Sequence, residues 1–124
     1  MVETASVTHV VESQHTARFV GSGDLDVLGT PVLLAWCEEA TCAALDLPVD
    51  RTSVGVRVEI EHLAASPVGM TVTVTAHVLE HTDRRASFAV SATDAAGTEL
   101  CRGRVERAVV DRERFLARLP RVGD

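Results

Sequence analysis

Several residue types and patterns are missing from this chain of 124 residues, and each absence narrows the function. Lysine does not occur, so all twelve basic residues are arginines, and with eighteen acidic residues the formal charge is −6. A nucleic-acid-binding surface needs a basic field to neutralise phosphates, so this balance argues against nucleic acid as a partner. No apolar run approaches eighteen residues, so we expect no membrane-spanning helix.

Signals for export, metals and common cofactors are missing as well. The start, MVETASVTHV, lacks the basic and long apolar regions of a secretory leader. Three cysteines, Cys37, Cys42 and Cys101, leave an odd count, for which reduced thiols in the cytoplasm are the simplest interpretation. The cysteines and five histidines show no metal-site spacing, and phosphate-binding loops and the G-x-S-x-G elbow are absent, so we expect no metal and no cofactor. No repeat or linker interrupts the chain, which predicts one domain over residues 1–124.

One segment stands out by its hydrophobicity, since residues 29–45 read GTPVLLAWCEEATCAAL. Thr30 followed by Pro31 is typical of a helix start, with the threonine as cap. We expect a helix over residues 30–46 that is buried on nearly all sides. Glu38 lies in its apolar stripe with no cation at helical spacing, and such a carboxylate is costly unless it is paired or used in chemistry. Glu38 is therefore a candidate site residue, with a rim residue that reaches water as the alternative.

After Pro48 the apolar period changes from 3.6 to 2, the period of strands. We expect a ragged continuation of the first strand through 16–20 and, at the end of the chain, a short helix from Asp111 to Leu119 that docks through Phe115 and Leu116. The strands themselves are expected over residues 5–12, 52–64, 70–80, 86–92 and 98–110. One inner face of the second strand is expected to carry Val54, Val56, Val58 and Ile60, and His62 continues their parity as a core or a site residue.

A strand, a long helix and four consecutive strands predict the α+β class, with the helix packed on one face of an antiparallel sheet. A helix this apolar needs cover on all sides, which a curved sheet of five strands provides. Such a sheet leaves exposed edges, and pairing two copies edge to edge hides them. We therefore expect a homodimer.

The motifs TPVLLAWCEEATCAAL, TSVGVRVEIEHLAASPVG and RVERAVVDRERF resemble those of hotdog-fold thioesterases of the fluoroacetyl-CoA thioesterase type, over nearly the whole chain. The most specific piece is H-x-A-A-x-P-x-G, which runs from His62 to Gly69. The resemblance implies a long central helix wrapped by a curved five-stranded antiparallel sheet. It also implies an acyl pocket bordered by Gly55, beside which Val56 replaces the usual threonine, and a catalytic set made of Thr30, Glu38 and His62.

The activity that this resemblance implies is hydrolysis of an acyl-CoA or other acyl thioester with a short or small acyl group. The reaction needs a base, a placed water or nucleophile, and donors for the oxyanion, for which the backbone N–H groups of Val32 and Leu33 are candidates. Thr30 and Glu38 lie about 12 Å apart along a regular helix, so either the helix starts late or irregularly or the two residues meet across a dimer interface. We favour the interface and expect sites built from both subunits. A binding module without turnover is the alternative. A hotdog hydratase ranks third, because no Asp-x₄-His pattern surrounds His62.

Two further expectations concern the substrate. Members of this type carry an aromatic lid before the threonine, whereas residues 21–29 contain no aromatic, which argues against selectivity for fluoroacetyl groups. Arginines are candidates for holding the phosphates of coenzyme A, with an ordinary solvated face as the alternative. These candidates are Arg102, Arg104, Arg107 and the pair Arg84-Arg85.

Overall fold

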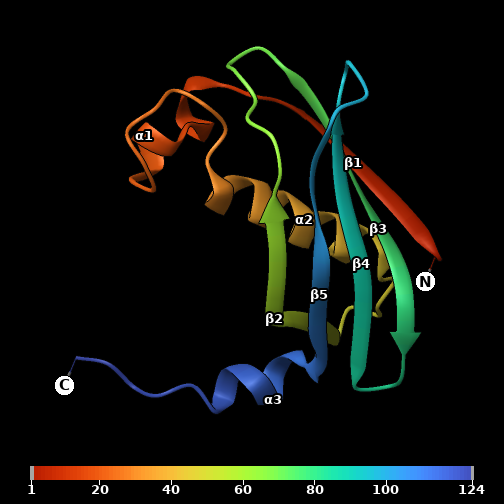
Figure 1. The fold of residues 1–124 in the computed structure, drawn as a ribbon. Coiled ribbons are helices and arrows are strands. Elements are labelled where there is room, and N and C mark those ends of the chain that lie inside the picture. Colours follow the sequence, from red (N-terminus) through yellow and green to blue (C-terminus); the bar gives the residue numbers. More distant parts are fainter. Residues whose placement is uncertain (1, 124) are drawn as a thin grey trace.

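The structure is a computed structural model that describes residues 2–123 (Figure 1). Its five strands form one antiparallel sheet in the order β1-β3-β4-β5-β2, and the sheet curves around the long helix α2. This is the predicted α+β arrangement, which is confirmed. In chain order the elements are β1 (Thr4–Val10), a 3₁₀ turn (Ser13–His15), α1 (Ala17–Val20), α2 (Thr30–Ala44), β2 (Arg51–His62), β3 (Thr71–His81), β4 (Arg85–Asp94), β5 (Glu99–Asp111) and α3 (Arg112–Ala117).

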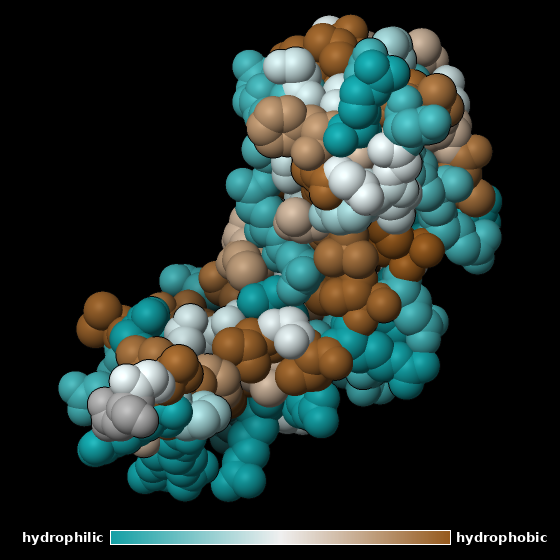
Figure 2. Space-filling model, turned by 90° about the vertical axis from the view of Figure 1, so that its left-hand side faces the viewer, coloured by the Kyte–Doolittle hydropathy of each residue, from teal (hydrophilic) through white to brown (hydrophobic). Residues whose placement is uncertain are grey.

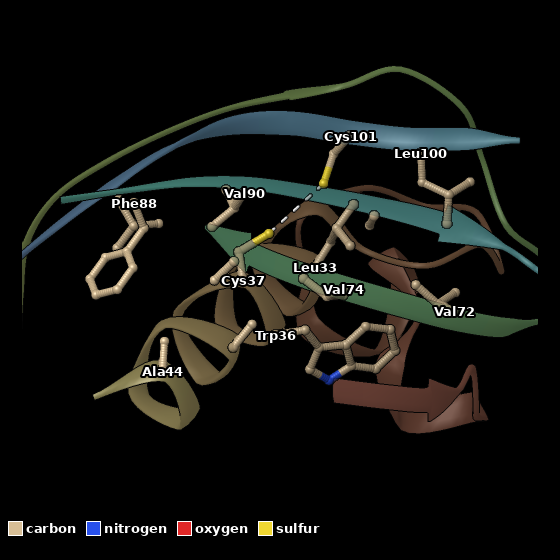
Figure 3. Packing of buried hydrophobic residues seen from close by; sticks show 14 of the residues in the cluster. Leu33, Trp36, Cys37, Ala44, Val72, Val74, Phe88, Val90, Leu100 and Cys101 are labelled. Atoms are coloured by element: carbon tan, nitrogen blue, oxygen red, sulfur yellow. Dashed lines mark hydrogen bonds between the residues drawn. The ribbon is translucent and has the colours of Figure 1, made fainter. Parts of the chain in front are cut away.

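Helix α2 contacts all five strands and forms the centre of the core. Its buried side chains recur every three or four residues, which is typical of a helix with one broad face against a sheet. The prediction that it is buried on nearly all sides is wrong within this chain, because Ala35, Glu39 and Ala43 are exposed on its other face. Figure 3 shows them packed against the inner faces of β3, β4 and β5. The helix ends at Ala44, two residues before the predicted end, because Leu45 already has an extended backbone. No helix within residues 2–123 has the length and hydropathy needed to cross a bilayer.

Two thiols meet in this core, between the helix and β5 (Figure 3). The Sγ atoms of Cys37 and Cys101 lie 3.8 Å apart, and both side chains are fully buried and reduced. The hydrogen bond to Cys101, together with burial, raises the pKa of the Cys37 thiol. Cys42, by contrast, is exposed on the helix surface.

The prediction of a strand continuing through residues 16–20 is wrong, because this stretch forms the short helix α1. The hydroxyl of Thr16 accepts a hydrogen bond from the backbone N–H of Phe19 (3.2 Å), which caps the helix start. Gly21 ends the helix with φ of 83°, a conformation that glycine adopts at little cost. Local capping therefore outweighs the weak alternation of apolar residues.

The terminal helix α3 is shorter than predicted, although Asp111 caps it as expected by accepting from the N–H of Arg114 (2.9 Å). The prediction that Phe115 and Leu116 dock it is wrong within this chain, because they are 36% and 58% exposed. The helix projects beyond the ends of the strands (Figure 1).

A β-bulge divides β2 into two parts. Its register on β5 shifts between Gly55 and Arg57, so Val56 is the extra residue and stands 47% exposed. Beyond the bulge the predicted inner face is retained. Before it the parity is reversed, so Val54 falls on the outer face, and the predicted continuous inner stripe from Val54 to Ile60 is wrong.

The reversed parity changes which residues in the first part of β2 face the helix. Ser53 and Gly55 now share the inner face with Arg107 of β5, which pairs directly with Gly55. The bulge thus brings polar groups of two strands to the side of α2. Strand β2 is also one free edge of the sheet, and Figure 2, which looks onto that side, shows hydrophobic surface in the hollow between the α1 end and the α3 end.

Candidate active site

A threonine and a histidine meet at the start of α2. The Oγ1 atom of Thr30 and the Nδ1 atom of His62 lie 2.8 Å apart, at hydrogen-bond distance. Thr30 is the first residue of the helix and Gly29 is its N-cap, so the expectation that the threonine hydroxyl caps the helix is wrong. The hydroxyl is directed instead at the last residue of β2. Two of the three predicted catalytic residues are therefore in contact.

The H-x-A-A-x-P-x-G motif explains why these two residues meet. The loop after His62 pairs with the segment just before Thr30, since the N–H of Leu28 donates to the carbonyl of Ser66 (2.9 Å) and Val27 bridges to Pro67. The loop closes at Gly69, whose φ of 97° favours glycine. This motif therefore positions both His62 and the chain segment that leads to Thr30.

The second ring nitrogen of His62 is unsatisfied. Its Nε2 atom is buried and has no hydrogen-bond partner within residues 2–123. Buried polar side-chain atoms nearly always have a partner, so an orphaned one marks a place where a ligand or water belongs. This atom is the strongest indication that the threonine–histidine pair serves chemistry.

Glu38 has an ion-pair partner that the sequence analysis missed. Its Oε2 atom accepts a hydrogen bond from Nη1 of Arg107 at 3.1 Å. Arg107 is held in turn by Ser53, donating from Nε to the hydroxyl (2.9 Å) and from Nη2 to the carbonyl (3.2 Å). The Arg107 side chain is 8% exposed and that of Glu38 32%, so the carboxylate can still meet a ligand.

A signal for this pair was present in the sequence. The inner positions of β5 are otherwise small or apolar, and Arg107 is the one cation among them. A buried cation needs a carboxylate, and Glu38 is the carboxylate in the apolar stripe of the helix. The neighbouring Glu39 points elsewhere, where its Oε1 atom lies 2.6 Å from Nε2 of His9.

Gly55, the residue implied to border the acyl pocket, lies against the carboxylate of Glu38. A Cβ atom at this position would overlap the Oε2 atom of Glu38. Glycine is therefore required here by close approach and not by an unusual backbone angle. Val56, the bulge residue, follows it at the exposed rim.

The expected oxyanion donors are contradicted by the structure. The backbone N–H groups of Val32 and Leu33 both donate to the carbonyl of Gly29 (3.1 Å each), so neither is free for a substrate. The side chain of Leu33 is also buried in the core (Figure 3). The N–H of Thr30 is the available donor, since it makes no backbone hydrogen bond within the described residues.

Glu38 does not join the threonine–histidine pair within one chain. Eight residues of helix, about 12 Å, separate it from Thr30, and no hydrogen bond links its carboxylate to either residue in the described part of the chain. The same part contains no cluster of three side chains able to hold a metal. The single chain thus presents two half-sites on one helix.

Three of the arginines considered for phosphate binding are already paired with carboxylates. Arg102 lies 2.9 Å from Glu99, Arg104 lies 3.8 Å from Glu106, and Arg107 is the partner of Glu38. Buried Arg107 in particular is unavailable to a phosphate. Only Arg84 and Arg85 of the predicted set remain without such a partner among residues 2–123.

A five-stranded sheet curved around one long helix, with a threonine–histidine pair at the helix start, defines a hotdog-fold protein of the thioesterase superfamily. Solved structures agree with this class. A hypothetical protein of Thermus thermophilus, described as a thioesterase superfamily member, has a TM-score of 0.85 at 26% identity, covering 92% of this chain and 85% of that one.

Within this class the chain belongs to the FlK family. The family model described as fluoroacetyl-CoA-specific thioesterase matches residues 11–113. A solved fluoroacetyl-CoA thioesterase is 32% identical with a TM-score of 0.87, covering 97% of this chain and 98% of its own. The fluoroacetyl-CoA thioesterase of Streptantibioticus cattleyicolor is 43% identical over 67 residues, 54% of this chain and 48% of that protein, so the match spans about half its length. The predicted family, and with it a family of thioester hydrolases, is confirmed.

Proposed function

We propose that this chain hydrolyses the thioester of a small acyl group carried on coenzyme A. The observation that carries the proposal is the Thr30–His62 hydrogen bond, with the second nitrogen of His62 buried and unpartnered. A solved threonine-to-serine mutant of the fluoroacetyl-CoA thioesterase, 31% identical to this chain with a TM-score of 0.87, is described in complex with acetyl-CoA. An acyl-CoA thioester is a suitable ligand for the Thr30–His62 pair, because the start of a helix favours the negative charge that develops on the thioester oxygen.

In the proposed reaction, Thr30 either attacks the thioester carbonyl or holds the attacking water. His62 accepts the proton through Nδ1 when its Nε2 carries the hydrogen, and it returns a proton to the departing thiolate. The N–H of Thr30 and the positive end of the α2 dipole stabilise the oxyanion.

Glu38 completes the site from the partner subunit. Its Oε2 atom accepts from Arg107, and its Oε1 atom has no hydrogen-bond partner within residues 2–123. That oxygen can orient or deprotonate the attacking water. Since its own Thr30 is too distant, we propose that the carboxylate of each chain serves the threonine–histidine pair of the other.

A homodimer through β2 provides this geometry. At twelve residues β2 is longer than β1, the other edge strand of the sheet with seven, and hydrophobic surface lies beside it (Figure 2). Two β2 strands paired antiparallel about a two-fold axis would satisfy both free edges. They would also bring the end of each strand, where His62 lies, to the beginning of its partner.

The substrate is proposed to carry a small acyl group without fluorine selectivity. The segment before Thr30 still contains no aromatic between residues 21 and 29, and Phe19 on α1 is 69% exposed instead of packed over the site. Three free thiols suit a reducing compartment, and we propose that the protein works in the cytoplasm.

The test is a hydrolysis assay with acetyl-CoA, in which a thiol reagent detects the coenzyme A that is released. We expect Thr30→Ala, His62→Gln and Glu38→Gln each to lower kcat/KM by about 10²–10⁴-fold, the usual effect of losing an acid–base group. Matched controls are His81→Gln and Glu80→Gln, which change exposed residues of β3, away from the proposed β2 interface. If all three site variants hydrolyse as fast as the parent, these residues do not carry the reaction and the proposal is wrong. If the parent binds acyl-CoA without turnover, the protein is a binding module.

A further inference from the structure

A cleft at the opposite end of the sheet from the threonine–histidine pair is lined by arginines. It has a volume of about 710 Å³ and lies where α3 leaves the sheet. Arg51 at the start of β2, Arg84 in the β3–β4 turn, and Arg114 and Arg118 of α3 line it, together with Asp50 and Asp111. Four positive and two negative residues give a local charge of +2 in a chain of net charge −6.

None of these four guanidinium groups has a carboxylate partner within residues 2–123. The arginines that do, such as Arg57, Arg102 and Arg107, lie elsewhere. The Nε atom of Arg51 is buried with no hydrogen-bond partner, although its Nη2 donates to the carbonyl of Asp83 (2.9 Å). A guanidinium with a buried, unused donor indicates that an acceptor is missing from this cleft.

Neither aspartate supplies that acceptor among the described residues. The carboxylate of Asp111 caps α3 by accepting from the N–H of Arg114. No side-chain hydrogen bond or ion pair joins Asp50 to an arginine of the cleft among the described residues. Several unpaired guanidinium groups around one cleft are suited to phosphate, whose oxygens accept in the geometry of their donors.

An aromatic ring is the second feature of the cleft. Phe115 lines it and is exposed, in a chain with only three phenylalanines, one tryptophan and no tyrosine. Aromatic faces and guanidinium planes both stack on nucleobases. The cleft therefore offers contacts for a base as well as for phosphates.

We propose that this cleft binds the phosphorylated adenine nucleotide at the far end of coenzyme A. The inference rests on the proposed function, because the nucleotide belongs to the substrate whose thioester lies at the catalytic pair. Within one chain the cleft and His62 stand at opposite ends of β2, about 36 Å of strand apart, longer than a pantetheine arm. In the antiparallel β2 pair, the Arg51 end of one chain lies beside the His62 end of its partner, so each cleft serves the other chain's site.

The test compares thioesters with and without the nucleotide, using variants of two exposed arginines. We expect the double variant Arg114→Gln/Arg118→Gln to raise KM for acetyl-CoA by about tenfold or more, because each charge-assisted contact is typically worth about tenfold. The measured quantity is the ratio of kcat/KM for acetyl-CoA to that for acetyl-N-acetylcysteamine, which should fall by the same factor. The matched control, Arg102→Gln, removes an exposed arginine that is paired with Glu99 outside the cleft.

Three outcomes would overturn the inference. Unchanged kcat/KM values for both esters mean that the cleft does not hold the nucleotide, even if hydrolysis itself is confirmed. A loss of equal size for the N-acetylcysteamine ester means that the variant disturbs the reacting end. A loss seen with acetyl carrier protein, whose phosphopantetheine has no nucleotide, but not with acetyl-CoA assigns the cleft to a carrier protein instead.

A binding experiment distinguishes failure of this inference from failure of the proposed function. If the parent hydrolyses no thioester, coenzyme A alone is titrated calorimetrically into the parent and the double variant. A weaker Kd in the double variant supports the nucleotide cleft without catalysis, and an equal Kd overturns it.

Discussion

Gly55→Ala is a probe of the Glu38 carboxylate that changes no charged residue. A Cβ atom at Gly55 would overlap Glu38 Oε2 and would lie 3.5 Å from Nη1 of Arg107. The carboxylate is the end of a flexible side chain, so we expect it to withdraw, by about 1 Å, until ordinary contact is restored. A misplacement of about 1 Å in a catalytic group can cost about 10²-fold in rate. We therefore predict that Gly55→Ala lowers kcat/KM for acetyl-CoA by about 10–100-fold.

The same substitution should leave stability almost unchanged. The φ angle of Gly55 is not in the left-handed region, so alanine is tolerated by the backbone and gains about 0.5–1 kcal/mol over glycine within a strand. The ion pair with buried Arg107 is lengthened but not broken, which we expect to cost about 1 kcal/mol and so to offset that gain. Thermal unfolding should therefore give a Tm within about 5 °C of the parent.

Two comparisons make the result decisive. Gly103→Ala is the same chemical change in the neighbouring strand, but its Cβ would overlap the backbone of Glu59, so it should lower the Tm and spare the rate of the folded enzyme. In a Glu38→Gln background, Gly55→Ala should cost little further rate, because both changes act on one group. A Gly55→Ala enzyme within twofold of the parent would refute the idea that the position of this carboxylate controls the rate. So would an undiminished loss in the Glu38→Gln background.

Three further predictions follow from the same structure. Light scattering at micromolar concentration should give twice the chain mass of 13.3 kDa, and a monomer with intact fold would contradict the β2 interface. In competition kinetics, fluoroacetyl-CoA should show no strong preference over acetyl-CoA, because residues 21–29 supply no aromatic cover, and a strong preference would contradict that reasoning. A thiol reagent should modify only the exposed Cys42 in the native protein and all three cysteines after unfolding. The reason is that Cys37 and Cys101 are buried and that the pKa of the Cys37 thiol is raised. Rapid modification of all three cysteines in the native state would show that the core opens.

The element order and the family were predictable from the sequence because they depend on local signals. Hydrophobic period, the Thr30-Pro31 start and the spacing from His62 to Gly69 all lie within short windows. The Thr30–His62 contact was implied only by resemblance, and the pairing of the loop after His62 with Val27 and Leu28 explains why that spacing works.

What the sequence analysis missed depends on register and long-range contact. Val54, Val56, Val58 and Ile60 alternate so regularly that nothing local reveals the extra residue at Val56. Without that shift, Ser53 and Gly55 would have been placed on the outer face, far from Glu38 and Arg107. The exposed position of α3 could not be predicted from the sequence either. Its apolar residues Phe115 and Leu116 look like docking residues, but they stay exposed within one chain.

The bulge at Val56 separates two kinds of constraint along a single strand. Beyond it, Val58 and Ile60 pack against the core, where a change of volume is felt by many neighbours. Before it, Ser53 and Gly55 face Arg107 and the ion pair, Val54 faces outward, and this part of the strand carries little of the core. We therefore expect substitutions in this part of β2 to change activity more than stability, and substitutions at Val58 and Ile60 to change stability more than activity.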